Sequence, residues 1–428
     1  MIKRIIQIWE NLTPYVRSWR RRLVIFLAIV GPGVITAVAD NDAGGVATYT
    51  VAASMYGIAS RFFIVPEMLL LAITQEVGSR IAIVTQKGLG DLIRERFGIK
   101  ISLILFFFYF VTNQGVILQN ITGLKASYQI FNLPWKLLLV LTSVFLVFIV
   151  VNFSYNRLQK VFLLMIFFYL SYVVVAVITK PDWIDTIRES FVFPQKVKLD
   201  LGFWFSRIAV LGTTITAWGQ FFIHSYVVDK KLSEQHLKYS KYEVYFGTIL
   251  TTVFSFMMAI AVSETLFRSH IRVSDGYTAA LALKPLAGDL AFALFGAGLF
   301  GASLLGLTIV PLATAYVFSE LFGYEGSLDN NFSRGRLFYS FFILQIFIGL
   351  IAALFPSTSL FRLTLYVDFL NGALLPVIFY FLIRFAEDRE LMGNYALSGF
   401  NKYFLRGSAL VITFAVIIIF AGKILGLG

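Results

Sequence analysis

Repeated apolar segments about 20 residues long are the feature that most limits what this chain can fold into. The 428 residues are 58% hydrophobic and only 14% charged, with a mean hydropathy of +0.79. A water-soluble globule of this length is not expected to be so apolar. Because about 20 helical residues cross the hydrocarbon core of a bilayer, the pattern predicts an all-α membrane protein with many spans.

We count about eleven membrane-spanning helices by this criterion. Lys and Arg are concentrated in alternate loops between the spans, which predicts a plasma-membrane protein with a cytoplasmic N-terminus. The same placement argues against nucleic acid as the partner of a chain with a net charge of +12. The absence of Cys excludes disulfides and thiolate metal sites. The expected spans cover residues 23–54, 62–84, 101–125, 136–153, 160–179, 203–228, 244–267, 288–321, 336–354, 361–386 and 404–426.

A polar segment with two glycines interrupts the first span. Asp40, Asn41 and Asp42 are followed by Gly44 and Gly45 in the middle of an otherwise apolar helix. Irregular backbone at membrane depth is tolerated only where it is buried in protein or lines a watery cavity. Ionisable residues at that depth mark functional sites. We therefore predict an unwound segment from Asp40 to Gly45 that faces a site for a positively charged substrate.

The sixth span contains a second interruption, from Gly212 to Gln220, with three threonines and two glycines. It opens a second unit of five spans, as the Asp40 segment opens the first. Transporters built from inverted repeats place two broken helices in corresponding positions, where unwound carbonyls and helix ends bind ions. A Gly-rich packing kink is the alternative for either interruption alone. The pair of interruptions predicts a cation site.

This arrangement divides the chain into five expected parts. They are a cytoplasmic N-terminal segment, a first inverted repeat of five helices, an external loop, a second inverted repeat, and a cytoplasmic loop with the last helix. We have no chemistry to assign to the external loop. The expected bounds are 1–22, 23–179, 180–202, 203–386 and 387–428. A short amphipathic cytoplasmic helix is expected over 85–100.

Motifs in both interruptions resemble a known family. Gly31-Pro32-Gly33 and Asp42-Ala43-Gly44-Gly45 are similar to the Gly-Pro-Gly and Asp-Pro-Gly-Asn signature in the first span of the Nramp divalent-metal transporters. The stretch from Thr214 to Gly219, with His224 and Ser225 downstream, is similar to the family's sixth-span motif. Similar stretches also include Gln75–Phe97, Asn371-Gly372 and Pro376. The resemblance implies the leucine-transporter-type fold and a divalent metal ion as the transported substrate.

Two positions depart from the family's set of metal ligands. The resemblance aligns Asp42 with the metal-binding aspartate, but Gly45 stands in place of an asparagine and Ala217 in place of a methionine. A thioether suits softer metals, whereas carboxylates, carbonyls and water suit Mg²⁺ and Mn²⁺. The departures resemble the Nramp-related magnesium transporter branch and predict a wide site for partly hydrated Mg²⁺, and also Mn²⁺. The expected metal site comprises Ala39, Asp40, Asp42, Gly45, Thr214, Ala217 and Gln220.

The positions that couple metal to protons in the family also differ here. The resemblance aligns its acidic third-span residues with Ile117 and Asn120, and its sixth-span histidine with Gly219. No carboxylate occurs in residues 101–125. We therefore expect transport without proton coupling. A membrane potential of about 100 mV alone favours entry of a divalent ion by about 4.6 kcal/mol.

For several polar residues the sequence allows two possible roles. Asp40 is either a second ligand or a group that holds the unwound backbone, while Asn41 is expected to cap backbone groups. Asp368 either strengthens the cation site or pairs with a helix end. For His224 we favour an interhelical hydrogen bond over a gating role. The residues expected around the site or pathway are Asn120, Gly219, His224, Asp368 and Asn371. Asn120 and Gln220 either hold the water shell of the ion or form ordinary interhelical hydrogen bonds.

Enzyme function is not expected. The sequence contains no phosphate-binding glycine loop, no His-Glu-x-x-His and no nucleophile elbow. No cofactor is predicted, and the only predicted partners are the transported ion and the bilayer. Glu67, Glu76 and Glu264 are expected to be structural or at the pathway edge. Two alternatives remain, a proton-coupled Mn²⁺/Fe²⁺ transporter and a Na⁺-coupled symporter of organic solutes such as amino acids. A symporter should offer free helix N-termini to its substrate.

Overall fold

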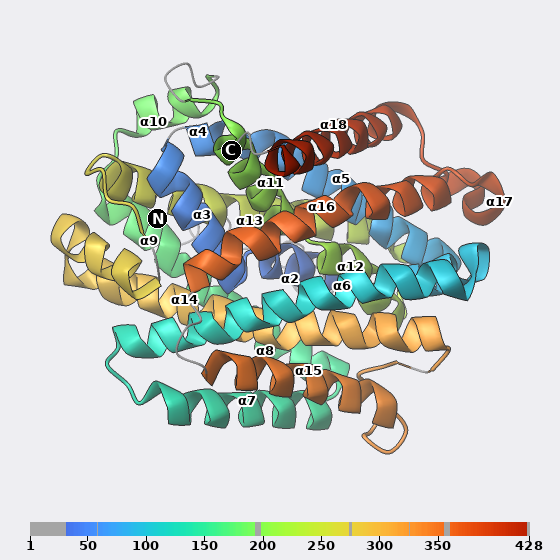
Figure 1. Cartoon of the computed structure of the whole chain (residues 1–428). Coiled ribbons are helices and arrows are strands. Elements are labelled where there is room, and N and C mark those ends of the chain that lie inside the picture. The colour runs from blue at the N-terminus through green and yellow to red at the C-terminus, as the bar shows by residue number, and fades with distance from the viewer. Residues whose placement is uncertain are drawn as a thin grey trace, which may run out of the picture.

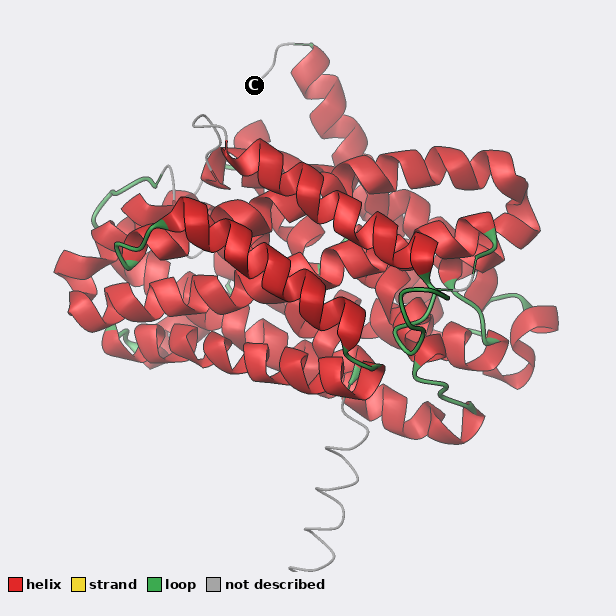
Figure 2. Cartoon of the chain, turned by 90° about the horizontal axis from the view of Figure 1, so that it is seen from below, coloured by secondary structure: helices red, strands yellow, loops and turns green. Residues whose placement is uncertain are grey.

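Every regular element that the structure describes is a helix (Figures 1 and 2). The structure is a computed structural model and describes residues 31–428 except 58, 193–197, 274–275, 325, 355–359 and 426–428. The predicted N-terminal segment 1–22 and the start of the first span lie outside the described residues. The all-α class predicted from the apolar segments is confirmed.

Nine of the described helical segments are long and apolar enough to cross a membrane. Two further spans are interrupted. Together with these nine segments they account for the eleven expected spans. The helices are α2 (Pro32–Ala39), α3 (Ala43–Tyr56), α4 (Ala59–Phe62), α5 (Ile64–Thr85), α6 (Leu89–Ile130), α7 (Trp135–Asn152), α8 (Tyr155–Ile166), α9 (Leu170–Ile178), α10 (Trp183–Ser190), α11 (Leu201–Thr214), α12 (Ala217–Asp229), α13 (Leu237–Val262), α14 (Gly276–Phe322), α15 (Arg336–Leu354), α16 (Leu360–Ala386), α17 (Arg389–Met392) and α18 (Gly399–Ile424).

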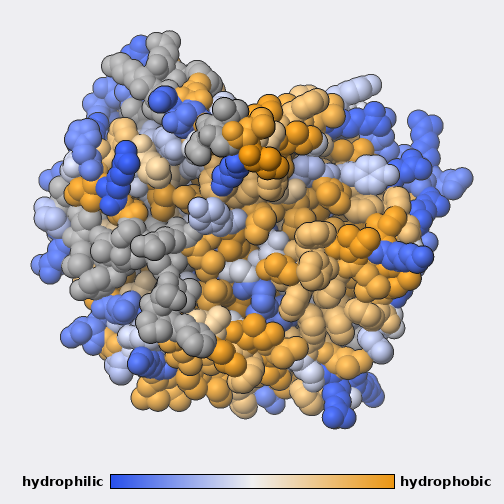
Figure 3. Space-filling view, viewed as in Figure 1, coloured by the Kyte–Doolittle hydropathy of each residue, from blue (hydrophilic) through white to orange (hydrophobic). Residues whose placement is uncertain are grey.

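The outer surface of the bundle is apolar between its two polar ends. Figure 3 shows hydrophobic residues across the middle of one face and hydrophilic residues towards its left and right edges. On α6, the side chains of Ile104, Phe107 and Phe108 are more than half exposed. Such an apolar exterior matches the hydrocarbon core of a bilayer, in which these side chains contact lipid.

Two long helices contain a break at a glycine. Gly98 in α6 has φ 80° and Gly288 in α14 has φ 86°, conformations that glycine adopts at little cost. The first break separates the spanning part of α6 from an amphipathic helix that begins at Leu89. Leu92 and Ile93 of that helix are buried. The short amphipathic helix expected over 85–100 is therefore present as the first part of α6.

The two interrupted spans lie in the middle of the bundle. In Figure 1, α2, α3, α11 and α12 are surrounded by α16, α13, α6 and α14, and α18 lies at the edge. Close backbone contacts hold these central helices. A Cβ atom added to Gly247 of α13 would lie 2.7 Å from the Val34 Cα of α2. Small residues of this kind let membrane helices approach closely.

Candidate functional site

The first interruption is shorter than the sequence predicts. Helix α2 ends at Ala39 and α3 already begins at Ala43, so only Asp40, Asn41 and Asp42 lie outside helical structure. The prediction of an unwound segment as far as Gly45 was wrong in its extent. Asp42 is the N-cap of α3, and its Oδ1 accepts a hydrogen bond from the Gly45 N–H at 3.1 Å. This cap starts the helix before the glycine pair.

The second interruption is also short. Helix α11 ends at Thr214 and α12 begins at Ala217, so the break consists of Ile215 and Thr216. Thr216 is the N-cap of α12, and its Oγ1 accepts a hydrogen bond from the Gly219 N–H at 2.9 Å. Both breaks are therefore ended by a capping oxygen that satisfies backbone donors at the start of the next half-helix.

The two breaks contact each other directly. Thr216 Oγ1 donates a hydrogen bond of 2.5 Å to Asp40 Oδ1, and the Gln75 side chain of α5 donates to Asp40 Oδ2 at 3.1 Å. The hydroxyl groups of Tyr49 on α3 and Thr214 on α11 lie 2.5 Å apart. The prediction that two spans are interrupted side by side is confirmed. Asp40 joins the two breaks through its hydrogen bonds.

Asp42 contacts the third span of the bundle. Asn120 of α6 donates a hydrogen bond of 2.6 Å from Nδ2 to Asp42 Oδ2. Asn120 Oδ1 accepts a hydrogen bond of 3.1 Å from the Ala43 N–H. Asn120 was predicted from its alignment to lie near the site, and the structure places it in direct contact with the first interruption.

A third buried carboxylate, Asp368 of α16, contacts side chains of α3 and α6. Its Oδ1 accepts from Gln119 Nε2 at 3.1 Å, and its Oδ2 accepts from the Thr48 hydroxyl. Asp40, Asp42 and Asp368 are all buried, and we refer to these three carboxylates as the acidic region. The hydrogen bonds of Asp368 come from side chains within α3 and α6. The sequence left open whether Asp368 pairs with a helix end, and the described contacts include no such pairing.

No positively charged side chain of the described residues pairs with the acidic region. Asp40, Asp42 and Asp368 are each at most 2% exposed. Among the described residues, none of the three carboxylates forms an ion pair with Lys, Arg or His. Buried charges are costly unless they are paired or coordinate a metal. A bound cation would supply the missing positive charge.

Within the ranges that the structure describes, His, Cys, Asp and Glu side chains alone do not form a complete metal site. No three His, Cys, Asp or Glu side chains in the described part of the chain gather closely enough to hold a metal ion. The other oxygens near the breaks belong to amides, hydroxyls and backbone carbonyls. Hard cations such as Mg²⁺, which keep several water ligands, suit such a set.

Further residues predicted for the site lie at or near the two interruptions. Asn371 Oδ1 of α16 lies 3.4 Å from the Ala217 N–H. Gln220 is fully buried, and neither atom of its side-chain amide has a hydrogen-bond partner among the residues that the structure describes. Gly219 lies beside Asp40, because a Cβ at this position would lie 2.6 Å from Asp40 Oδ1. Ala39, the last residue of α2, is buried.

Two predicted roles were wrong. Asn41 does not cap its own backbone: its Nδ2 donates to Thr251 O and to Ser255 Oγ of α13, at 2.9 and 2.7 Å. It anchors the break to α13, because a side-chain amide can donate two hydrogen bonds. The expected interhelical hydrogen bond of His224 is also absent from the described contacts. Its Nδ1 contacts the Gln220 carbonyl one turn earlier on α12, at 2.8 Å.

Four residues that contact the carboxylates were not predicted as site residues. Thr216 could have been found, since a threonine directly before a helix is a typical N-cap. Gln75 and Gln119 are amides within apolar spans, a signal for buried hydrogen bonding, but their partners depend on tertiary packing. Thr48 gives no distinct signal in the sequence.

The glutamates expected to be structural form ion pairs away from the breaks. Glu67 pairs with Arg207, and Glu76 pairs with Arg80 on the same helix. Glu264 is paired by arginines of α4 and of the segment after α13. These pairs agree with the structural interpretation.

Comparison with protein families identifies the chain. The family model described as Natural resistance-associated macrophage protein-like (Nramp) matches residues 33–422. The chain belongs to the Nramp family. One member, the divalent metal cation transporter MntH of Bradyrhizobium diazoefficiens, is 22% identical over 400 residues, covering 90% of this chain and 86% of that protein. The MntH protein of Staphylococcus aureus strain JH9 is 22% identical over 231 residues, 52% of this chain and 50% of that protein.

Solved structures share the architecture of this chain. The manganese transporter of Eremococcus coleocola superimposes with a TM-score of 0.70 at 18% identity, covering 93% of this chain and 88% of that one. MhsT in complex with L-phenylalanine matches with a TM-score of 0.61 at 14% identity, covering 91% and 96%. This Nramp protein therefore has the predicted leucine-transporter-type fold and is a multi-pass membrane transporter rather than an enzyme.

Proposed function

We propose that this Nramp protein moves divalent metal ions across the plasma membrane into the cytoplasm, with its N-terminus on the cytoplasmic side. The proposed substrate is partly hydrated Mg²⁺, with Mn²⁺ as a second substrate. Relatives named as divalent metal cation transporters support the substrate class. The observation that carries the proposal is the group of buried, uncompensated carboxylates where two interrupted helices meet.

The chemistry of the breaks supports the proposed preference for hard ions. Neither break contains methionine or cysteine, so neither supplies a soft sulfur ligand. The proposed ligands are Asp42 and oxygen atoms at the end of α2 and the start of α12, together with water. Asp40 would act chiefly by joining the breaks. Gln220, whose buried amide has no hydrogen-bond partner in the described part of the chain, would hold the water shell of the ion.

Transport by this site requires a conformational change, since its carboxylates are buried. We propose alternating access, in which α2 and its surroundings move relative to the rest of the bundle. Proton coupling is not part of the proposal. The aligned third-span positions carry Ile117 and Asn120, neither of which titrates, and Asn120 is occupied by hydrogen bonds to Asp42 and the Ala43 amide.

Flux into liposomes tests this function. Purified protein should admit Mg²⁺ and Mn²⁺, detected by indicators trapped inside. Asp42→Asn should reduce uptake to the level of protein-free liposomes, because it removes the charge while asparagine remains a good N-cap for α3. Asp185→Asn, an exposed change on α10, is the matched control and should leave uptake unchanged. Full uptake by the Asp42→Asn variant would contradict the proposed site.

The amino acid symporter alternative is tested in the same liposomes. A Na⁺ gradient with radiolabelled amino acids should produce no uptake above background. The first interruption presents Asp40 and Asp42 where a symporter of this fold is expected to leave helix ends free for a substrate carboxylate. Na⁺-dependent accumulation of an amino acid without metal flux would replace the metal proposal.

A further inference from the structure

A polar pocket lies where α16 ends, between α17 and the amphipathic helix that forms the first part of α6. Its volume is about 590 Å³, and three of its lining residues are arginines. Figure 1 shows α17 at the end of the bundle where α6 begins. None of the predicted metal-site residues lines this pocket. The lining consists of Arg96, Phe97, Arg384, Asp388, Arg389 and Glu390.

The pocket has one more positive than negative charge, because three arginines line it with only Asp388 and Glu390. Arg96 pairs with Asp388, which also caps the start of α17. In the part of the chain that the structure describes, Arg384 and Arg389 form no ion pair. The pocket therefore offers two guanidinium groups, each a planar set of donors that suits the oxygen atoms of a phosphate.

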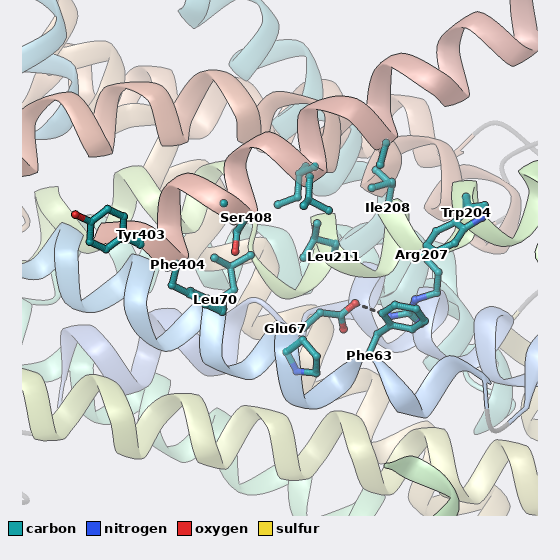
Figure 4. A pocket seen from close by; sticks show the side chains of 15 residues that line it. Phe63, Glu67, Leu70, Trp204, Arg207, Ile208, Leu211, Tyr403, Phe404 and Ser408 are labelled. Atoms are coloured by element: carbon teal, nitrogen blue, oxygen red, sulfur yellow. Dashed lines mark hydrogen bonds and ion pairs between the residues drawn. The ribbon is translucent and has the colours of Figure 1, made fainter. Parts of the chain in front are cut away.

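The two unpaired arginines can be reached from outside the protein. Arg384 and Arg389 are both exposed. Arg207, at the other end of the bundle, shows the contrasting arrangement, because it is buried and its charge is paired with Glu67 (Figure 4). A ligand in the polar pocket can therefore contact the guanidinium groups without displacing any part of the protein.

A lipid-facing strip of α16 leads into the pocket. Val377, Tyr380 and Arg384 follow one another at helical spacing on one face of α16, and the first two are 44% and 54% exposed. Ile101 of α6, just beyond the break at Gly98, is also 44% exposed. Because Arg384 lies near the end of a membrane-spanning helix, the pocket is at the depth of lipid headgroups. A phosphate in the pocket would suit a molecule whose apolar part lies along this strip.

We propose that this pocket binds the headgroup of an anionic glycerophospholipid such as phosphatidylglycerol. The lipid belongs to the leaflet at this end of the bundle, which is the cytoplasmic one in the proposed orientation. Its phosphodiester accepts hydrogen bonds from Arg384 and Arg389, and a headgroup hydroxyl donates to Glu390. One acyl chain lies along Val377 and Tyr380.

The charge of the pocket supports an anionic occupant. Basic pockets beside the cytoplasmic ends of membrane helices bind anionic headgroups. The single negative charge of the diester matches the one excess positive charge of the lining. The bound lipid would connect the end of α16 to the amphipathic helix of α6.

Quenching by a brominated lipid tests the proposal. Because the chain has no cysteine, Val377→Cys gives a single attachment site for a bimane fluorophore on the lipid-facing strip of α16. Leu344→Cys on α15 is the matched reporter, because Leu344 is 47% exposed and lies about as far from Arg336 as Val377 does from Arg384. The full chain is reconstituted in phosphatidylcholine bilayers that contain increasing fractions of phosphatidylglycerol or phosphatidylcholine with brominated acyl chains.

At the α16 reporter, half-maximal quenching should need roughly tenfold less brominated phosphatidylglycerol than brominated phosphatidylcholine. At the α15 reporter the two lipids should quench equally. Arg384→Gln combined with Arg389→Gln should remove the difference at the α16 reporter, because glutamine carries no charge. Arg334→Gln combined with Arg336→Gln is the matched control and should keep it, since these two exposed arginines do not line the pocket. If the first double variant does not elute as a single species, Arg389→Gln alone replaces it.

Equal quenching by the two lipids at the α16 reporter, or a preference that the glutamine variants retain, would show contact with bulk lipid only and overturn the proposal. Loss of the preference when inorganic phosphate replaces chloride at equal ionic strength would show a site for free phosphate and would also overturn it. The assay contains no transported metal. Failure of the lipid site and failure of the transport function are therefore separate results.

Discussion

Two aspartates one residue apart have different environments in this protein. Asp40 accepts hydrogen bonds from Thr216 and Gln75, which come from the second break and from α5. Asp42 caps α3 and accepts from Asn120. Alternate residues in an irregular segment can face different neighbours, so their roles depend on the surrounding helices. The sequence alone left open whether Asp40 is a ligand or a structural group.

A substitution at Ala217 tests whether the softness of the ligands determines which metal ion is transported. Ala217→Met would place a thioether at the start of α12, and sulfur favours softer metals. We expect the ratio of Mg²⁺ to Cd²⁺ transport to fall by roughly tenfold or more in competition assays on liposomes. Ala217→Leu is the matched control, because it adds similar bulk without sulfur. An unchanged ratio in the methionine variant, or an equal fall in the leucine variant, would contradict selection by ligand softness.

Helices α11 and α16 pack closely at Gly212, which lies against the backbone of Asp368 and Gly372. A Cβ added to Gly212 of α11 would lie 2.0 Å from the Asp368 carbonyl oxygen and 2.4 Å from the Gly372 backbone nitrogen. Gly212→Ala should therefore push the helices apart and lower stability by about 1–3 kcal/mol. The measurement is the thermal midpoint of the detergent-solubilised protein. Gly407→Ala meets no neighbour and should be neutral or stabilising, since alanine is the better helix former.

The start of α2 is held by a carboxylate from another helix. Glu243 Oε1 of α13 accepts from the N–H groups of Gly31 and Gly33, at 2.5 and 3.0 Å. Backbone donors at a helix start need such a partner, and the helix dipole favours a negative group there. Glu243→Ala should release α2. Because the chain has no cysteine, Val34→Cys gives a single buried reporter on this helix.

Labelling of that cysteine by a membrane-permeant maleimide should be several-fold faster in the Glu243→Ala background, as the population with α2 displaced increases. Glu76→Ala, which removes a carboxylate paired with Arg80 on α5, is the control and should leave the rate unchanged. Equal labelling rates in all three backgrounds would show that Glu243 does not restrain α2.

The helices were predictable because a membrane span is recognised from the length and hydropathy of an apolar segment. The ninth span was expected over 336–354, and α15 runs from Arg336 to Leu354. The sequence also located both interruptions, since charge and glycine in an apolar helix are local signals. Their extent was overestimated because capping by Asp42 and Thr216 depends on side-chain geometry. The partners of Asn41 were missed because α13 follows about 200 residues later in the chain.

The molecule as a whole combines an apolar exterior with an acidic interior. This contrast affects the free energy of moving an ion through the protein. Lipid-facing side chains cover the outside, while Asp40, Asp42 and Asp368 are buried in the centre without a described ion-pair partner. At the proposed site, a divalent ion would supply the positive charge that this centre lacks. If no proton moves with it, each transport cycle carries net positive charge across the membrane.

Net charge movement predicts that the membrane potential alone drives uptake. A potential of about 100 mV, negative inside, favours entry of a divalent ion by about 4.6 kcal/mol, or roughly three decades of accumulation. In liposomes with a valinomycin-set potassium potential, Mg²⁺ uptake should increase as the interior becomes more negative, and a pH indicator inside should record no acidification. Liposomes that contain the Asp42→Asn variant give the background rate of ion leak. Acidification in proportion to Mg²⁺ entry would mean that another group of this chain carries protons, since Asn120 and Gly219 cannot titrate.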